Sequence, residues 1–216
     1  MTWIVRALST SVGKKQLMAI TGLLFLLFLA VHLIGNLSIY RGAEAFVAYA
    51  EGLHGLGGLL VLAEVGLLVC LIIHVTIGSI LFFENHRARP VKYAVDKTGG
   101  GGRTISSVTM PYTGLLILLF LAVHLATFSH HIVDQANRSV FQIAHELFAN
   151  WGFFALYLVS MVIVAFHVRH GLWSAFQTVG ANHPKYMLLI ERLSLIFAVI
   201  VGVGFASLPI VILLMS

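Results

Sequence analysis

The sequence predicts an all-α membrane protein with five transmembrane helices. Of its 216 residues, 59% are hydrophobic and only 10% are charged, whereas soluble domains carry about 25% charged residues. The chain contains five apolar runs, and each is long enough to cross a bilayer, which takes about 20 residues. Backbone polar groups in hydrocarbon must be satisfied within their own segment, so we expect helices rather than barrel strands. We expect a single transmembrane domain over residues 1–216.

The five predicted spans follow the five apolar runs, with polar or glycine-containing segments between them. They cover residues 17–39, 58–83, 112–132, 149–172 and 188–214. The first run is a full span without a small-residue cleavage pattern, so no cleavable signal peptide is expected. The lone Cys70 allows no internal disulfide and no CxxC metal site. The glycine-rich stretch Thr98–Arg103 is expected to be a flexible link between spans two and three.

Lysine and arginine predict the orientation of the chain, because they are enriched on the cytoplasmic side. Eleven of them lie before span one, between spans two and three, or between spans four and five. Only Arg41 and Arg138 lie on the opposite side. We therefore expect a cytoplasmic N-terminus, an external C-terminus and a location in the cytoplasmic (inner) membrane as a multi-pass protein.

Two helix pairs form a predicted repeat. Residues 22–38 read GLLFLLFLAVHLIGNLS and residues 114–129 read GLLILLFLAVHLATFS, and both place a histidine ten residues after the first glycine. These histidines, His32 and His124, are 92 residues apart. Such self-similarity indicates a unit that has been used twice.

The second helix of each pair also carries a histidine. His74 begins HVTIG and His167 begins HVRHG, and these two are 93 residues apart. The predicted topology puts His32 and His124 in the outer half of the membrane, and His74 and His167 in the inner half. At 1.5 Å per residue, the two levels are separated by about 10 to 20 Å.

Two histidines at one depth, on different helices, are the ligands that a bis-histidine haem b requires. A lone membrane histidine is often a side chain bonded to a neighbouring helix, but four that are paired by depth favour function. Zinc is disfavoured because each level offers only two imidazoles. The sequence therefore predicts an outer haem on His32 and His124 and an inner haem on His74 and His167. Gly35, Gly78 and Gly171 are interpreted either as room for a macrocycle or as ordinary helix packing.

The haem propionates need donors. For the inner haem the candidates follow spans two and four on the expected cytoplasmic side, although most of them also fit a solvated basic face. They are Arg87, Arg169, His170, Trp173 and Ser174.

Nearly the whole chain resembles the single-subunit, diheme cytochrome b558 membrane anchors of succinate dehydrogenase and fumarate reductase. The resemblance rests on one histidine in each of the first four spans, on HLIGN at His32–Asn36, on GAEAF at Gly42–Phe46, and on HVRHGLWSAFQTVG at His167–Gly180. It implies two haems b and a quinone, usually menaquinone. It also implies flavoprotein and iron–sulfur partner subunits on the cytoplasmic side, which carry the FAD, the iron–sulfur clusters and the succinate–fumarate chemistry.

Two positions depart from that family. Some members have a glutamate two residues before the fourth haem histidine, where this chain has Ala165, so a proton path is not expected there. An arginine often precedes the third span, where this chain has Met110 and Pro111, and a contact from it is not carried over.

A quinone site needs an apolar slot, donors for the carbonyls and a proton acceptor. Glu64 lies inside span two, where a carboxylate is costly, and Glu51 and His54 precede the span on the same side. These three residues are the predicted quinone-site residues. A solvated loop remains an alternative for Glu51 and His54, and an inner site near His86, Ser106 and Ser107 remains open.

Two rival functions remain. Cytochrome b subunits of other redox complexes commonly place two haem ligands on one helix, which this chain does not. A haem-free transporter lined by histidines would need carboxylates along a pore, and Glu64 is the only convincing candidate. The sequence does not decide between succinate oxidation and fumarate reduction.

Overall fold

The computed structural model describes residues 2–3, 6, 9–88, 105–133 and 137–215, with no side-chain description for 105–107. Within these ranges the chain is helical and contains no strand. The predicted link Thr98–Arg103 and the basic residues of the same loop from Arg89 onward lie outside the described residues. So do the side chains of Ser106 and Ser107.

Five long helices are apolar enough to cross a membrane, as the sequence predicts. They are α2 (Ser11–Asn36), α4 (Gly58–Arg87), α5 (Ile105–Phe128), α7 (Trp151–Thr178) and α8 (Pro184–Leu214). Shorter elements lie between them: the 3₁₀ helix η1 (Leu37–Arg41), α3 (Ala43–His54) and α6 (Val140–Ala149). The expected all-α fold with five spans is therefore confirmed.

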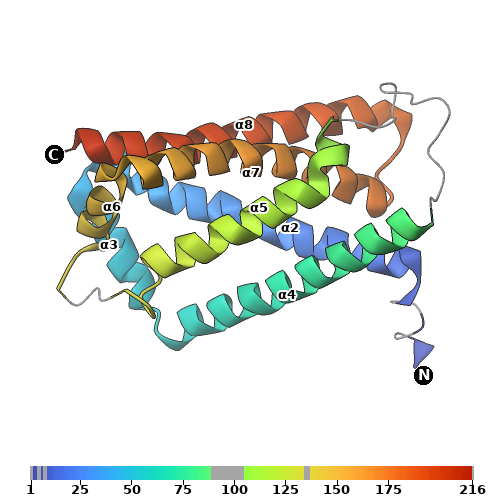
Figure 1. The fold of residues 1–216 in the computed structure, drawn as a ribbon, viewed down its shortest axis with the longest axis horizontal. Helices are drawn as coiled ribbons and strands as arrows, with labels where there is room; N and C mark the ends of the chain where they lie inside the picture. Colours follow the sequence, from blue (N-terminus) through green and yellow to red (C-terminus); the bar gives the residue numbers. More distant parts are fainter. Residues whose placement is uncertain (1, 4–5, 7–8, 89–104, 134–136, 216) are drawn as a thin grey trace.

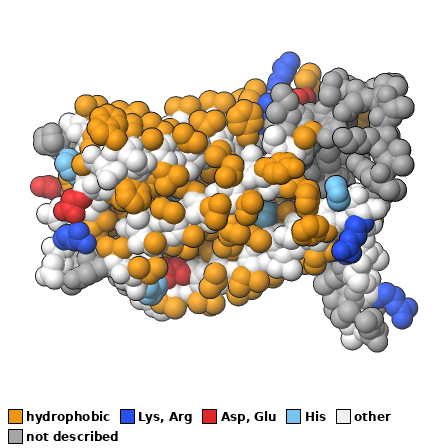
Figure 2. Space-filling view, in the orientation of Figure 1, with side chains coloured by type: hydrophobic (Ala, Val, Ile, Leu, Met, Phe, Trp, Pro, Cys, Tyr) orange, Lys and Arg blue, Asp and Glu red, His pale blue; other side chains and the backbone are white. Residues whose placement is uncertain are grey.

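The long helices run roughly side by side, and α2 starts at the end of the bundle opposite to the end where α8 finishes (Figure 1). The short helices α3 and α6 gather at the end where α8 finishes. Charged side chains lie mainly at the two ends of the molecule, with hydrophobic side chains over the belt between them (Figure 2). This distribution is what a bilayer requires of a spanning bundle.

Several boundaries differ from the predicted ones. Helix α5 begins before Pro111 and ends at Phe128, whereas the predicted span covered 112–132. Proline is tolerated in membrane helices because neighbouring groups satisfy the freed backbone. Residues 130–133 form a turn, in which the amides of Ile132 and Val133 donate to the carbonyl of Ser129. Helix α7 continues to Thr178, which is about one and a half turns beyond residue 172, where the predicted span ended.

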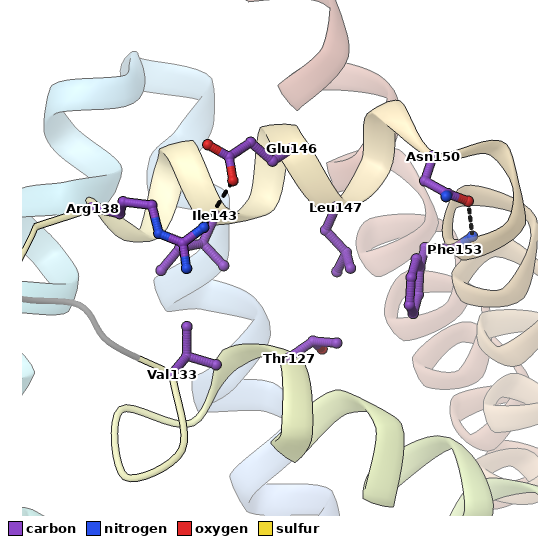
Figure 3. A pocket seen from close by; sticks show the side chains of 8 residues that line it. All are labelled: Thr127, Val133, Arg138, Ile143, Glu146, Leu147, Asn150 and Phe153. Atoms are coloured by element: carbon purple, nitrogen blue, oxygen red, sulfur yellow. Dashed lines mark hydrogen bonds and ion pairs between the residues drawn. The ribbon is translucent and has the colours of Figure 1, made fainter.

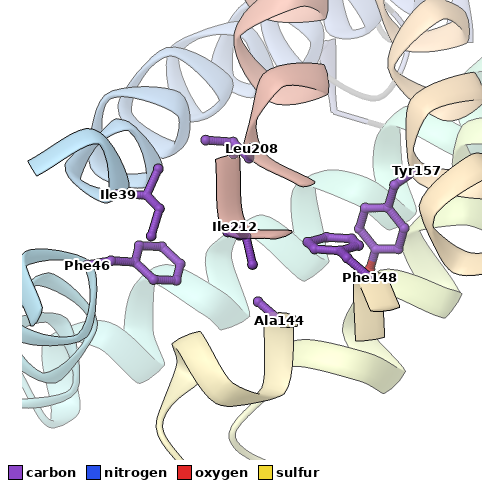
Figure 4. Packing of buried hydrophobic residues seen from close by; sticks show 7 residues of the cluster. All are labelled: Ile39, Phe46, Ala144, Phe148, Tyr157, Leu208 and Ile212. Carbon is purple, nitrogen blue, oxygen red and sulfur yellow. The ribbon is translucent and has the colours of Figure 1, made fainter. Parts of the chain in front are cut away.

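The short helices close a small core at the α3–α6 end of the bundle (Figure 4). Ile39 and Phe46 from η1 and α3 pack near Leu208 and Ile212 of α8, and Ala144, Phe148 and Tyr157 complete the cluster. Helix α6 starts with a capping box, in which Ser139 Oγ accepts from the Gln142 amide and Gln142 Oε1 accepts from the Ser139 amide.

Small residues allow the backbones of α7 and α8 to pack close together. A Cβ added to Gly202 would lie 2.9 Å from Ala165 Cβ. Position 165, where some family members are expected to have a glutamate, is therefore a close helix–helix contact in this chain. Interfaces of this kind let two helix backbones approach each other in a membrane.

Candidate functional site

The histidine of α4 is held by the first long helix. His74 Nδ1 lies 2.9 Å from Thr21 Oγ1, which is a buried hydroxyl on α2. The same hydroxyl donates to the backbone carbonyls of Leu17 (2.9 Å) and Met18 (3.1 Å) of its own helix.

The histidine of α7 is held in the same way by α5. His167 Nδ1 lies 3.1 Å from Thr113 Oγ1. The Thr113 hydroxyl donates to the carbonyls of Thr109 (3.1 Å) and Met110 (3.0 Å). The two helix pairs therefore contain the same threonine–histidine contact, made by threonines 92 residues apart.

This arrangement favours one tautomer of both histidines. Each threonine hydroxyl lies within donating distance of backbone carbonyls, which leaves its oxygen able to accept from the ring. In that tautomer His74 and His167 carry their proton on Nδ1, and Nε2 keeps its lone pair. A neutral imidazole with one nitrogen anchored and the other unprotonated is the usual form of a histidine metal ligand.

In both helix pairs a glycine lies against the imidazole ring of the second helix. A Cβ at Gly22 would lie 3.5 Å from His74 Cε1, and a Cβ at Gly114 would lie 3.3 Å from His167 Cε1. Each of these glycines directly follows the threonine, so the imidazole lies against bare backbone.

The glycines singled out in the sequence have other neighbours. A Cβ at Gly78 would lie 2.9 Å from Met18 Cε, one at Gly171 would lie 3.9 Å from Met110 Cε, and one at Gly35 would overlap the Tyr49 ring. These contacts favour the helix-packing interpretation of Gly35, Gly78 and Gly171.

The outer histidines face each other directly. The ring centres of His32 on α2 and His124 on α5 are 6.1 Å apart, with an angle of 81° between the planes. Metal–imidazole bonds are about 2 Å long, so two imidazoles on opposite sides of one metal ion have their ring centres about 6 Å apart. The observed spacing fits a shared metal. In the inner pair, His74 and His167 are close enough for a charge on one ring to affect the other.

Polar partners differ at the outer level. Tyr157 Oη lies 3.4 Å from His124 Nδ1 and 2.9 Å from Thr127 Oγ1, and Thr127 in turn donates to backbone carbonyls of α5. On the other side, the Asn36 amide nitrogen donates to the His32 carbonyl at 2.8 Å and lies 3.4 Å from His32 Nδ1. An amide donor does not fix a proton on Nδ1, so the tautomer of His32 gives no evidence for metal binding. The evidence for His32 is the spacing of its ring from that of His124.

The outer pair fits a bis-histidine group by its ring spacing, and the inner pair offers two imidazoles held in the same way by threonines. All four rings are half-buried in the bundle and come from four different long helices. Three of the four Nδ1 atoms face a hydroxyl oxygen that can accept a hydrogen bond from the ring. These residues supply imidazole nitrogen alone, which suits haem iron better than structural zinc.

The predicted propionate residues lie beyond the inner histidines along the same helices. Arg87 is the last residue of α4 and is exposed. Arg169, His170, Trp173 and Ser174 are half-buried on the C-terminal part of α7, where the His170 and Trp173 ring centres are 5.8 Å apart.

Two of the three predicted quinone-site residues, Glu64 and His54, lie beside the same histidine, His130, at the opposite end of the bundle. Glu64 Oε2 lies 3.0 Å from His131 Nε2, and Glu64 Oε1 lies 3.7 Å from His130 Nδ1. The His54 ring, at the end of α3, lies 4.7 Å from the His130 ring. Glu51 is exposed on α3, three residues before His54, and α3 replaces the loop that remained an alternative for both.

His130 and His131 were not assigned a role from the sequence. They belong to the turn after α5, and only the fold shows that this turn reaches the start of α4. Burial lowers the pKa of His130, as does the neighbouring charge on His131, while Glu64 acts in the opposite direction. The sequence signal that could have pointed to them is the pair of adjacent histidines directly after an apolar run.

A pocket of about 330 Å³ opens beside the outer histidine level, between α5 and α6 (Figure 3). Thr127, which is bonded to Tyr157, lies on one wall, and Phe153 lies on another. Arg138 and Glu146 form an ion pair of 2.9 Å across part of the rim.

Comparison with known proteins gives one curated relative. Over 156 residues the chain is 28% identical to the "Succinate dehydrogenase cytochrome b558 subunit" of Bacillus subtilis (strain 168), which covers 71% of this chain and 72% of the relative. No family model and no solved structure matches the chain. The resemblance predicted from the histidines and the HVRHGLWSAFQTVG stretch is confirmed: this chain is similar to a succinate dehydrogenase cytochrome b558 subunit.

Proposed function

We propose that this chain is the diheme cytochrome b membrane anchor of a succinate:quinone oxidoreductase, acting as a succinate dehydrogenase or a fumarate reductase. The observation that carries the proposal is that four long helices each supply one half-buried histidine, with His32 facing His124 and with His74 and His167 held by the same threonine contact. The name of the relative supports a cytochrome b of this class. The five apolar helices support an integral membrane location, which we propose to be the cytoplasmic membrane.

Two haems b would supply one-electron transfer between a quinone in the membrane and a redox partner at its surface. His32 and His124 would hold the outer group, and His74 and His167 the inner group. Thr21 and Thr113 would keep the proton of the inner ligands on Nδ1 and so aim Nε2 into the bundle. Arg87, Arg169, His170, Trp173 and Ser174 remain the candidates for the inner propionates.

Glu64 and His54 are proposed to serve quinone, with menaquinone as the expected type. Oxidation of a quinol releases two protons, so the site needs acceptors at the edge of the membrane. Glu64 lies two turns inside α4, and its carboxylate is bonded to His131. Protons could therefore leave toward the exposed turn at 130–133. Glu51 lies on the exposed face of α3, where it would take up a released proton rather than contact the ring.

The chain is proposed to contribute the quinone half of an enzyme. Its partners would be a flavoprotein and an iron–sulfur subunit at the end where α2 begins, which is the basic and predicted cytoplasmic side. Dicarboxylate chemistry, FAD and iron–sulfur clusters would belong to those subunits.

The rival functions make different predictions about cofactor content. A cytochrome b of another quinone-linked complex would also bind haem but would assemble with a different soluble partner. A histidine-lined transporter would bind none. The facing rings of His32 and His124 and the threonine–histidine pairs favour haem over a pore.

The first test is the haem content of the purified chain. A pyridine haemochrome assay and a dithionite-reduced spectrum should give about two low-spin b haems per chain. A well-folded preparation without haem would contradict the proposal and favour the transporter.

Ligand variants then test the assignment. His74→Ala or His167→Ala should remove the inner haem and leave the outer one, and His32→Ala or His124→Ala should do the reverse. Redox titration distinguishes the two levels by their midpoint potentials. His145→Ala, on α6 and outside both levels, is the control and should keep both haems.

A further inference from the structure

One cluster of ligand-type side chains lies apart from the four membrane histidines. It consists of Glu64 at the start of α4 and of His130 and His131 in the turn after α5. One carboxylate oxygen and one nitrogen from each ring all lie within 4.8 Å of one another. We propose that these three residues form a binding site for a zinc ion at the α3–α6 end of the bundle.

The distances between ligand atoms are close to those of a zinc site. Zinc bonds to nitrogen and carboxylate oxygen are about 2.0 to 2.2 Å, so ligand atoms of a tetrahedral site lie about 3.3 Å apart. Glu64 Oε2 lies 3.0 Å from His131 Nε2, and Glu64 Oε1 lies 3.7 Å from His130 Nδ1. The ring centres of the two histidines are 3.9 Å apart. Small rotations of the side chains are enough to close the set around an ion.

The composition of the set selects the metal. Two imidazoles and one carboxylate, with a fourth position left for water, are a common zinc ligand set in proteins. Calcium and magnesium prefer oxygen ligands alone, and the absence of sulfur in this set disfavours Cu(I). The His54 ring stands 4.7 Å from the His130 ring and borders the open side of the cluster.

The cluster is accessible and lies in a field that attracts cations. The side chains of Glu64, His130 and His131 are 36%, 29% and 57% exposed, so an ion can enter from water. Among the described residues, the same end of the bundle holds further carboxylates on α3 and α6 and two arginines, Arg41 and Arg138, of which Arg138 pairs with Glu146. The net negative charge raises the local concentration of a divalent cation.

Local backbone structure holds the histidine doublet in place. The His131 amide donates to Ser129 Oγ at 3.3 Å, and Ser129 also accepts two backbone amides through its carbonyl. The two rings are thus presented together by one turn, while Glu64 comes from a different helix. A zinc ion here would tie α4 to the end of α5. This inference goes beyond the proposed electron transfer and does not depend on it. The site shares Glu64 with the proposed quinone site, so zinc bound there would occupy the carboxylate that otherwise accepts a proton from the quinol.

The test uses the full chain in detergent and zinc chloride as the probe. Isothermal titration calorimetry should show one site per chain, and X-ray absorption at the zinc edge should show two imidazoles with bonds of about 2.0 to 2.1 Å. The variants His131→Ala, His130→Ala and Glu64→Gln should each weaken binding by more than about tenfold. The control His145→Ala should bind zinc as the unmodified chain does.

Three outcomes would overturn the site. They are zinc binding that is equally strong in the His130 and His131 variants, equal loss in the His145 variant, or a zinc-edge spectrum without imidazole. The last measurement is made on the unmodified chain, so the site can be rejected even if a variant fails to fold.

Discussion

Replacing Thr21 with valine tests how the inner histidines are held. Valine keeps the branched shape but removes the hydroxyl that accepts from His74 Nδ1 at 2.9 Å. The ring would then lose the hydroxyl partner of its Nδ1 while its proton remains half-buried. Such a loss typically costs about 1 to 3 kcal/mol when a buried donor is left unsatisfied.

That free energy converts into a measurable change in haem binding. Loss of an outer-sphere partner of a metal-ligating histidine lowers affinity by about 10- to 100-fold, and tenfold corresponds to about 1.4 kcal/mol. We therefore expect Thr21→Val to release its inner haem about 10 to 100 times more readily. The proposed outer haem should be unaffected, because its proposed ligands His32 and His124 lie next to each other rather than beside Thr21.

The reduction potential offers a second measure of the same bond. A hydrogen bond from Nδ1–H makes the imidazole a stronger donor, which favours the oxidised iron. Without it the midpoint potential of the inner haem should rise, by about 59 mV for each tenfold difference in affinity between the two oxidation states.

The assay combines haem transfer to a scavenging apoprotein with an optical redox titration. Thr21→Ser keeps a hydroxyl and should behave like the unmodified chain, while Thr113→Val should reproduce the effect through His167. Unchanged haem retention and potential in both valine variants would refute the reasoning.

Three further predictions follow. Glu64→Gln should slow quinol turnover while both haems remain, because the proton acceptor is lost but the bundle is not; equal turnover would remove Glu64 from the quinone site. Tyr157→Phe should shift the potential of the outer haem alone, since the tyrosine hydroxyl lies between His124 and Thr127; a shift of the inner haem would show a different coupling. Ile212→Ala, at a side chain 3% exposed in the end core, should destabilise the protein by about 2 to 5 kcal/mol in thermal unfolding. Leu214→Ala, at 78% exposure, should cost much less, and equal costs would count against the packing of that core.

The sequence predicted the five spans because long apolar runs leave the chain little choice in a membrane. It did not predict α3 and α6, which are too short and too mixed in composition to stand out. Their stability comes from packing onto Leu208 and Ile212, which are more than 150 residues away from η1 and α3 in the chain.

The threonine contacts were also missed, although a signal was present. Thr21–Gly22 and Thr113–Gly114 are TG pairs at the spacing of the repeat. A hydroxyl in a membrane helix usually bonds its own backbone, and here it does so while also accepting from a histidine. The meeting of Glu64 with His131, 67 residues later, depends on how a turn packs and has no periodic signature.

Helix α4 has a consequence for how the protein is made. Only 6% of its membrane segment is buried within the chain, the same share as for α5 and less than the 28% for α7 and for α8. Among the described residues its polar ties to the bundle include His74 and Cys70 to Thr21, Glu84 to Lys14 at one end, and Glu64 to the turn after α5 at the other. Insertion of the proposed haem would therefore be a late step of biogenesis. In that step α4 would change from a helix largely surrounded by lipid to one held in the bundle by His74. If the proposed haem fixes α4, cells short of haem should accumulate a chain whose α4 is open to membrane proteases.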